Sequence, residues 1–478
     1  MLAQKAATPH HPPAAKGATA GPSAGWQQIP IPKLPEFHPQ EPKRIQLANG
    51  MIIFLQEDHE LPVVGGSMRI RGGSVWEPAA KTGLLDIYGE VWRTGGTTSR
   101  TGDQLDDYLE ARAAKVETGA GPDSTSIVFN CLKDKFDDVF PLFLDLLRNP
   151  AFREDKIELA QREMATDIAR RNDDLGGIAG REAVRLGYGK DNPYARIPEF
   201  ATIASITRAD LVKWHQDFVH PNNIILGIYG DFDSVAMEQR LRKEFDSWQK
   251  APLPPKPATE FHDPKPGIYF IAKEDVNQTA IRMVALGVQR NNPDFFNLEV
   301  MNEVLGGGFS SRLFKSIRTE KGLAYSVGGG IGAAFDHPGL SRISMGTKSA
   351  TTVDAIQALR DELQGMLTRP ADKAEVSDAR DDILNAFIFR YDSKEKVLGE
   401  RLLYEFYGYP ADYLERYRSA VEKTAPEDVN RVAHKYIHPS AFATLVVGNA
   451  AEFGKPLSTL GPVTPVDITI PPPPPGQK

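Results

Sequence analysis

The sequence predicts an α+β protein made of two duplicated halves, and three observations support this. A proline-rich stretch, KAPLPPKPATEFHDPKPG from Lys250 to Gly267, divides the 478 residues into two segments of similar size. Blocks of the first segment recur in the second at a separation of about 215 residues. In each segment β-rich runs precede amphipathic helical patterns. We therefore expect each half to form a mixed, mainly antiparallel sheet with helices packed on one face, and the linker to join the halves into a clamshell.

The duplicated blocks occur in the same order in both segments. LDIYGEVW from Leu85 corresponds to LEVMNEVL from Leu298, with acids at the second and sixth positions. DLVKWHQDFVHPNNIILGIYG from Asp210 corresponds to DVNRVAHKYIHPSAFATLVVG from Asp428. A shorter pair is Glu57-Asp58 and Glu274-Asp275. Three blocks in one order at a nearly constant separation indicate an internal duplication.

The elements of each half follow from local patterns. MIIFLQ and VVGGSMRIR, like GIYFIA and AIRMVALGV, alternate apolar and polar residues as strands do, and NIILGIYG and FATLVVG predict a last strand in each half. His220-Pro221 and His438-Pro439 stand where a helix ends and a strand begins, because the residue before proline avoids helical angles. We interpret both histidines as turn residues rather than ligands.

Composition sets the limits of the domains and of the function. We assign residues 1–40 to a disordered tail, 41–249 to the N-terminal half, 250–267 to an extended linker, 268–460 to the C-terminal half and 461–478 to a Pro-rich tail. A net charge of -7 argues against a nucleic-acid binder, and no apolar run is long enough to span a membrane. The single cysteine, Cys131, lies in an apolar stretch that favours a buried structural thiol.

Several segments together resemble the pitrilysin and insulinase superfamily of metallopeptidases. The most specific is LGGGFSSRLFKSIRTEKGLAYSV, Leu305 to Val327, and LANGMIIFLQED, RNDDLGGIAGRE and the HPNN block add to it. The closest likeness is to two-half subunits similar to mitochondrial processing peptidase and to bacterial paired peptidases. Such a subunit is expected to be soluble, and we favour the bacterial periplasm over the cytoplasm. The resemblance leaves activity open, because the family contains catalytic and non-catalytic members.

The zinc motif of active members is degenerate in this chain. In those members H-x-x-E-H lies on the first long helix, two histidines bind zinc, the glutamate activates water, and a later acid completes the site. Here the histidine positions hold Asp86 and Glu90, and the base position holds Gly89. The later acid falls near Asp167, with Glu163 as the other possible register. The resemblance therefore implies no catalytic residue and no metal in this chain alone, with zinc in a partner subunit.

Two other interpretations of these acids remain. Asp86, Glu90 and Asp167 could hold Mg²⁺ or Ca²⁺, which prefer oxygen ligands, although neither ion replaces the missing base. We favour instead a solvated acidic pair at i,i+4 that faces a wet cavity. His434 and His438 share the same spacing but have no partner acid in register, so we interpret them as structural.

The part of the family pattern that handles peptide is intact. The resemblance implies that Arg318 and Tyr325 bind substrate carbonyls beside the scissile bond, whereas a local salt bridge and packing on a strand are the alternatives. Gly306, Gly307, Gly308 and Phe309 correspond to a glycine-rich substrate loop, but glycines also end helices. The run lacks the lysine of a phosphate loop.

We therefore expect a non-catalytic, peptide-binding subunit of a heterodimeric zinc metallopeptidase. Its partner would be a paralogue that carries H-x-x-E-H, with a homodimer as the alternative, and extended peptides would add a strand to a sheet edge. Two other functions are an independently active zinc metalloendopeptidase and a structural scaffold like the core subunits of respiratory cytochrome bc complexes.

Overall fold

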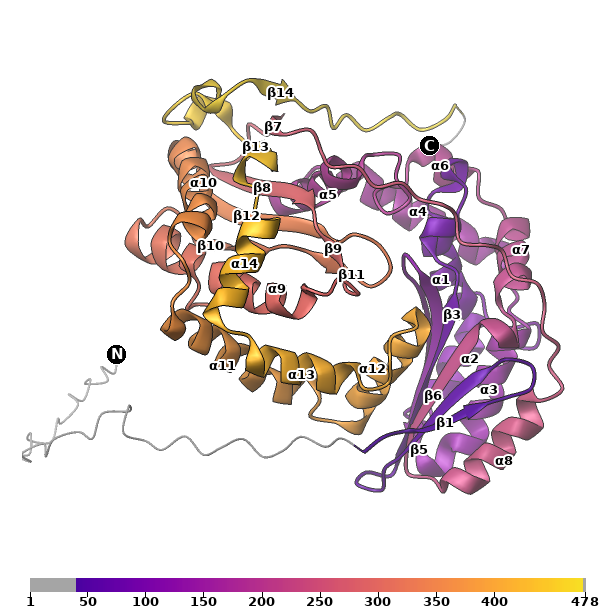
Figure 1. Cartoon of the computed structure of the whole chain (residues 1–478). Coiled ribbons are helices and arrows are strands. Elements are labelled where there is room, and N and C mark those ends of the chain that lie inside the picture. Colours follow the sequence, from indigo (N-terminus) through magenta and orange to yellow (C-terminus); the bar gives the residue numbers. More distant parts are fainter. Residues whose placement is uncertain (1–39, 476–478) are drawn as a thin grey trace, which may run out of the picture. The chain divides into compact units, whose positions relative to one another are not determined.

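The structure, a computed structural model, describes residues 40–475, which form two six-stranded sheets, one two-stranded sheet and their helices (Figure 1). The predicted α+β architecture of two similar halves is confirmed. The tail expected over residues 1–40 lies outside the described residues except for Gln40. Within the described range, every helix is too short or too polar to cross a bilayer.

The N-terminal sheet has the strand order β1-β2-β6-β3-β5-β4. Its strands are β1 Lys43–Gln46, β2 Ile52–Glu57, β3 Val63–Arg71, β4 Lys115–Ala120, β5 Ser124–Leu132 and β6 Ile224–Gly230. Its apolar face packs on helices α1 Leu84–Thr94, α2 Gly102–Glu110, α3 Phe136–Arg148, α4 Glu154–Arg170, α6 Phe200–Ala204, α7 Arg208–Phe218 and α8 Ser234–Phe245. Cys131 belongs to this core, and burial raises the pKa of its thiol to about 12, as expected of a structural thiol.

The C-terminal sheet has the strand order β10-β12-β8-β13-β7-β14. Its strands are β7 Gly267–Ala272, β8 Gln278–Leu286, β10 Ser326–Gly330, β12 Leu340–Lys348, β13 Ala443–Gly448 and β14 Val463–Pro465, and the short strands β9 Val288–Gln289 and β11 Ala333–Ala334 pair separately. The helices of this half are α9 Phe295–Asn302, α10 Thr352–Thr368, α11 Lys373–Arg390, α13 Tyr413–Lys423 and α14 Pro426–Tyr436.

The duplication is visible in the strand pairing. In both halves a parallel pair, β2 with β6 or β7 with β13, is extended by three antiparallel neighbours in the same order. Only the sixth strand differs, because β1 is antiparallel to β2 whereas β14 is parallel to β7. Strand β14 comes from the region expected to be a Pro-rich tail, and Val466 and Ile468 beyond it pack on the C-terminal core. Apolar residues among the prolines therefore tie this segment to the fold.

Each half also places one helix on the sheet of the other half. Helix α5, Leu175–Tyr188, follows α4 in the N-terminal half, yet Ile178 and Ala183 pack with Val284 of the C-terminal sheet. Helix α12, Lys394–Tyr407, does the reverse, and its Leu398, Leu402 and Phe406 pack on Phe54 and Ile225. Figure 1 shows α5 beside strand β8. The two halves thus share two apolar clusters rather than only a linker.

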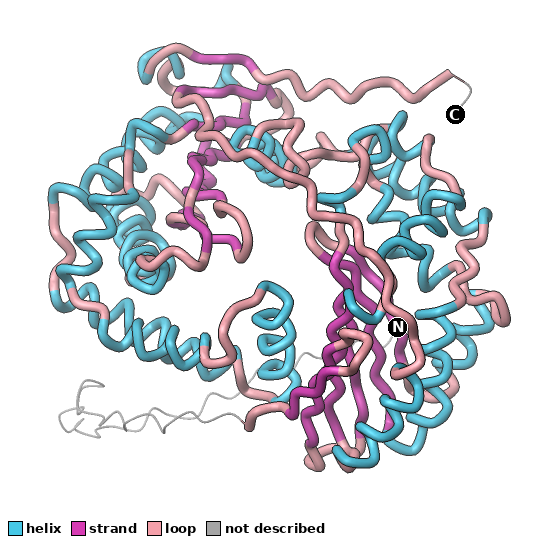
Figure 2. Tube along the Cα trace, turned by 45° about the vertical axis from the view of Figure 1, so that its right-hand side comes forward, coloured by secondary structure: helices cyan, strands magenta, loops and turns pink. Residues whose placement is uncertain are grey.

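The linker is extended, as its prolines predict, and polar contacts attach it to both halves. Residues 248–266 contain neither helix nor strand and appear as a loop in Figure 2. Lys256 pairs with Asp336 of the C-terminal half and donates to the Tyr194 hydroxyl at 2.9 Å. Asp123 accepts hydrogen bonds from Tyr194 at 2.9 Å and from Tyr407 at 3.0 Å. One polar cluster therefore joins the linker to both halves.

Because α12 packs on the sheet of the other half, removing one of its buried side chains should strongly lower stability, although α12 lies far from the degenerate zinc motif. Leu398 is 2% exposed, so Leu398→Ala should lower the free energy of unfolding by about 2–5 kcal/mol. Urea denaturation measures this value. Leu159→Ala is the control, because Leu159 is 39% exposed and should change stability by less than about 0.5 kcal/mol. Equal effects of the two substitutions would contradict this packing of α12.

Candidate functional site

A buried carboxyl group holds the start of helix α1, which carries the degenerate motif. Glu77 is 5% exposed, and its two oxygens accept the backbone N–H groups of Gly83 at 3.1 Å and Leu85 at 3.2 Å. Gly83 adopts φ 103°, a conformation that glycine reaches without strain. Burial raises the pKa of Glu77 to about 7 despite these two hydrogen bonds. The helix start is therefore bound to a group that titrates near neutral pH.

Asp86 and Glu90 project from α1 into a cavity of about 480 Å³. Its lining consists of four acids, two arginines and an apolar wall: Asp86, Glu90, Glu163, Asp167, Arg171, Arg181, Ala160, Met164, Ile168, Ile197 and Pro198. The cavity therefore contains both histidine positions of the motif and both candidates for the later acid.

The carboxylates of the cavity are poorly solvated although water reaches them. The side chains of Asp86 and Glu90 have large exposed surface areas. The concave walls around them still exclude enough water that burial raises the pKa of each carboxyl group. For Glu90 the charge of Glu163 and a hydrogen bond to it add to the rise in pKa. Glu163 is thus the acid that meets Glu90, while Asp167 lines the cavity one helical turn further along α4.

Gly89, at the base position, lies against the backbone of edge strand β4. A Cβ atom there would be 2.8 Å from the Ala120 nitrogen and 3.1 Å from the Gly119 carbonyl carbon. The Thr118 hydroxyl donates to the Gly89 carbonyl oxygen at 2.5 Å. This position therefore lacks a proton-accepting side chain, and the strand fills the space that such a side chain would need.

The residues present do not fit the zinc ion of the active motif. At the motif positions this chain has two carboxylates and a glycine. The active motif has two imidazoles that bind zinc and one carboxylate that acts as the base. Across residues 40–475, no three histidine, cysteine, aspartate or glutamate side chains are arranged to hold a metal ion. The same finding gives no support to a Mg²⁺ or Ca²⁺ site at Asp86, Glu90 and Asp167.

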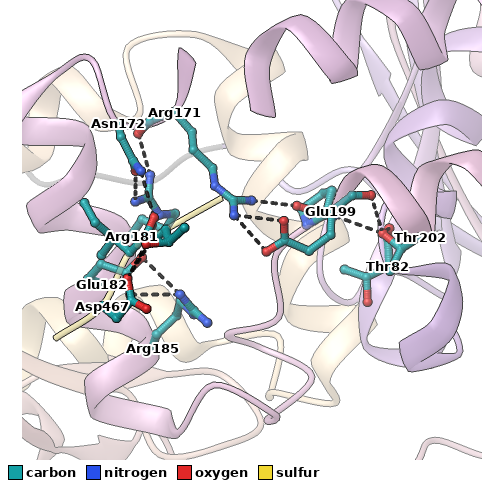
Figure 3. A network of polar contacts seen from close by, with 12 residues as sticks. Thr82, Arg171, Asn172, Arg181, Glu182, Arg185, Glu199, Thr202 and Asp467 are labelled. Atoms are coloured by element: carbon teal, nitrogen blue, oxygen red, sulfur yellow. Dashed lines mark hydrogen bonds and ion pairs between the residues drawn. The ribbon is translucent and has the colours of Figure 1, made fainter. Parts of the chain in front are cut away.

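The arginines of the cavity belong to a network at the turn between α4 and α5 (Figure 3). Arg171 donates to both carboxylate oxygens of Glu199 at 2.8 Å, and Arg181 donates to Glu182 at 2.8 Å and to Asn172 at 2.7 Å. Glu182 is 5% exposed and also accepts from Arg185. The spacing of these residues does not predict the network, and its one signal in the sequence is the dense charge of RNDDLGGIAGRE.

Arg318 and Tyr325 lie together at the start of edge strand β10. The Arg318 guanidinium lies over the rings of Phe314 at 4.5 Å and Tyr325 at 5.4 Å, and it has no ion pair among the described residues. Tyr325 is 85% exposed. Among the described residues the local salt bridge is not found, and Tyr325 is exposed rather than packed, so its hydroxyl is accessible to a ligand.

The glycine run ends a helix and exposes a neighbouring aromatic side chain. Helix α9 continues into a π-helical turn, Glu303–Gly307, and a Cβ on Gly306 would lie 2.6 Å from the Gly329 oxygen of β10. Gly308 packs on the Glu303 carboxylate, where a Cβ would be 2.7 Å from an oxygen. Phe309 is 79% exposed, with its ring 4.8 Å from that of Phe314. The helix-stop interpretation is therefore supported, and substrate contact by Gly306 to Phe309 stays a prediction.

The cavity predicts a variant that binds zinc but does not hydrolyse peptides. In Asp86→His/Glu90→His, two imidazoles at i,i+4 would face Glu163, and three such ligands suffice for zinc. We expect one zinc per chain by metal analysis and no cleavage of an unstructured peptide. Adding Gly89→Glu should lower stability by about 1–3 kcal/mol through the clash with β4. Zinc-dependent cleavage by the double variant would contradict the role assigned to Gly89.

Glu77 predicts a pH dependence of stability. Because its pKa is raised from 4.5 to about 7 in the folded chain, the folded state keeps the proton longer than the unfolded state. The contribution to stability is therefore complete below about pH 4.5 and is lost as the pH rises through about 7, by up to about 3 kcal/mol. Urea denaturation of Glu77→Gln should lack this slope, whereas Glu60→Gln, at an exposed turn, should keep it. A slope that persists in Glu77→Gln would assign the effect to other groups.

Comparisons with known proteins agree with this geometry. The model of Insulinase (Peptidase family M16) matches residues 52–175, and that of the Peptidase M16 inactive domain matches residues 205–382. A non-peptidase homolog from Helicobacter pylori is 22% identical over 403 residues, which are 82% of this chain and 90% of that protein. An uncharacterized zinc protease from Mycobacterium leprae is 23% identical, over 72% of this chain and 77% of its own.

Solved structures show the same fold. The crystal structure of a peptidase M16 inactive domain from Pseudomonas fluorescens has a TM-score of 0.79 and 22% identity, and covers 87% of this chain and 100% of its own. A protease from Helicobacter pylori has a TM-score of 0.76 and 18% identity, with 86% of this chain and 100% of its own covered. Together with both family models and the degenerate motif at Asp86, Gly89 and Glu90, these likenesses show that the chain belongs to the pitrilysin/insulinase (M16) superfamily as a member without the H-x-x-E-H zinc motif.

Proposed function

We propose that this chain is the non-catalytic, peptide-binding subunit of a heterodimeric zinc metallopeptidase of the insulinase type. The observation that carries the proposal is the packing of Gly89 against β4, which leaves the first helix without a general base and without room for one. Hydrolysis then needs a second subunit that carries H-x-x-E-H and zinc. The name of the non-peptidase homolog supports such a role for a chain of this fold.

The contribution of this chain to catalysis would come from the C-terminal half. Strand β10 is an edge strand, so its outer backbone groups can pair with an extended peptide by strand addition. Arg318 and the exposed Tyr325 lie at the start of this strand, where donors can meet a carbonyl oxygen of the bound peptide. Phe309, next to the same cluster, offers an apolar contact.

Two alternatives keep this fold but change its role. An independently active zinc peptidase is favoured by the name of the Mycobacterium leprae relative, but the donor set at the motif argues against it. A purely structural subunit has no need for an exposed tyrosine beside an arginine that has no ion pair in the described range. A homodimer of this chain would contain two copies of the same degenerate site.

The test is to mix the chain with an M16 paralogue that carries H-x-x-E-H. We expect cleavage of an unstructured peptide to need both chains, and Arg318→Gln or Tyr325→Phe in this chain to lower kcat by about 10²-fold, because a transition-state donor is lost. Arg416→Gln, on an exposed helix face, is the control with the same charge change and should leave kcat unchanged.

Each result of the mixing experiment has a definite meaning. Unchanged turnover in both variants would make Arg318 and Tyr325 structural residues. Full activity of the paralogue in the absence of this chain would refute the subunit role.

A further inference from the structure

Two arginines lie side by side on the C-terminal sheet without a carboxylate partner in the part of the chain that the structure describes. Arg282 of β8 is opposite Ser344 of β12, and Arg342 of β12 is opposite Val284 of β8. In an antiparallel pair this register makes the arginines diagonal neighbours on one face of the sheet. Val284 packs with α5, so the arginines occupy the face on which α5 lies and not the face of the buried core residues Ile343 and Met345.

The hydrogen bonds of this pair leave both charges uncompensated. Arg282 donates to main-chain carbonyl oxygens, those of Ile281 at 2.9 Å and Met345 at 3.5 Å. The Arg342 side chain has no hydrogen bond or ion pair with the described residues, and its Nε is buried. Burial, and then the charge of Arg342, lowers the pKa of Arg282. Guanidinium groups nevertheless stay charged in proteins, so a half-buried like-charge pair costs free energy that a bound anion would offset.

The N-terminal sheet also carries two arginines on the corresponding face, and there each side chain has a hydrogen-bond acceptor. On the corresponding face Arg69 donates to the Ser124 hydroxyl at 2.9 Å, and Arg71 donates to the Phe406 carbonyl oxygen of α12 at 2.6 Å. Helix α5 provides no comparable hydrogen-bond acceptor for the side chains of Arg282 and Arg342. Its buried acid, Glu182, is already bound by Arg181 and Arg185. A chain with 63 acidic residues and a net charge of -7 thus leaves this pair without an acid.

We infer that Arg282 and Arg342 form a subsite for the acidic side chains of an extended polypeptide bound at the C-terminal sheet. The inference rests on the proposed function and names its substrate class, segments that contain aspartate or glutamate. Carboxylates match the planar donors of arginine, and the ligand of this fold would be a peptide. A strand added outside β10 would run two strand spacings, about 10 Å, from Arg342 on β12, within joint reach of a glutamate and an arginine side chain, and Arg282 on β8 lies one spacing further.

The experiment measures binding to the full chain by fluorescence anisotropy. The probes are two labelled, unstructured peptides with amidated C-termini that differ only in carrying glutamate or glutamine at the same positions. We expect the glutamate peptide to bind about tenfold more tightly at low salt, since a charge-assisted hydrogen bond is replaced by a neutral one. Arg282→Gln/Arg342→Gln should abolish this preference, while Arg282→Lys/Arg342→Lys should keep most of it. Arg416→Gln should keep all of it.

The outcomes separate this inference from the proposed function. Equal binding of both peptides by the unaltered chain overturns the subsite and leaves peptide binding intact. Binding of neither peptide overturns the proposed function and the subsite with it. If the Arg282→Gln/Arg342→Gln variant shows unchanged thermal unfolding and still prefers the glutamate peptide, other residues are responsible for the selectivity. A third probe, the glutamine peptide with a free C-terminus, tests the other source of a carboxylate. If this probe binds more tightly than the amidated glutamate peptide, the terminal carboxylate is the ligand and the side-chain assignment is overturned.

Discussion

The close contact between helix α1 and edge strand β4 at Gly89 is the constraint on which the functional interpretation depends. A glycine lets the helix backbone approach the strand to a distance that no side chain permits, and the Thr118 hydroxyl fixes this approach. On the buried side Tyr88 and Trp92 anchor the same helix in the N-terminal core. The helix therefore cannot move outward to readmit a base without breaking both contacts, and Asp86 and Glu90 are left on the wall of a cavity.

The C-terminal half makes the same approach with a different residue. Asn302 occupies the position of Gly89 in the duplicated block, and its amide exchanges hydrogen bonds with the Ile331 backbone just after β10, at 2.7 and 2.9 Å. In both halves the helix is thus tied to the edge strand at the base position. The two halves differ in the residues next to this edge strand, because β10, unlike β4, is preceded by Arg318 and the exposed Tyr325. The proposed peptide contacts therefore belong to the C-terminal half.

The sequence predicted what depends on local pattern and repetition. The two sheets, the similar sequence of elements along each half and the degenerate positions follow from periodicity and from aligning the duplicated blocks. Other features needed distant contacts. Apolar residues between prolines did not reveal that β14 would pair with β7, and helix periodicity does not say on which sheet α5 or α12 packs. Spacing placed the later acid near Asp167, whereas the neighbouring acid that raises the pKa of Glu90 is Glu163. The uncompensated Arg282 and Arg342 appear only once the register of β8 and β12 is known.

We propose that this chain binds extended polypeptide without cutting it, because Asp86, Gly89 and Glu90 stand where the zinc motif has two histidines and a base. The most direct measurement is metal analysis of the purified chain after dialysis against zinc, paired with mass spectrometry of an unstructured peptide incubated with that same sample. The account predicts no stoichiometric zinc and an intact peptide that remains bound. One zinc per chain together with chelator-sensitive cleavage would contradict it.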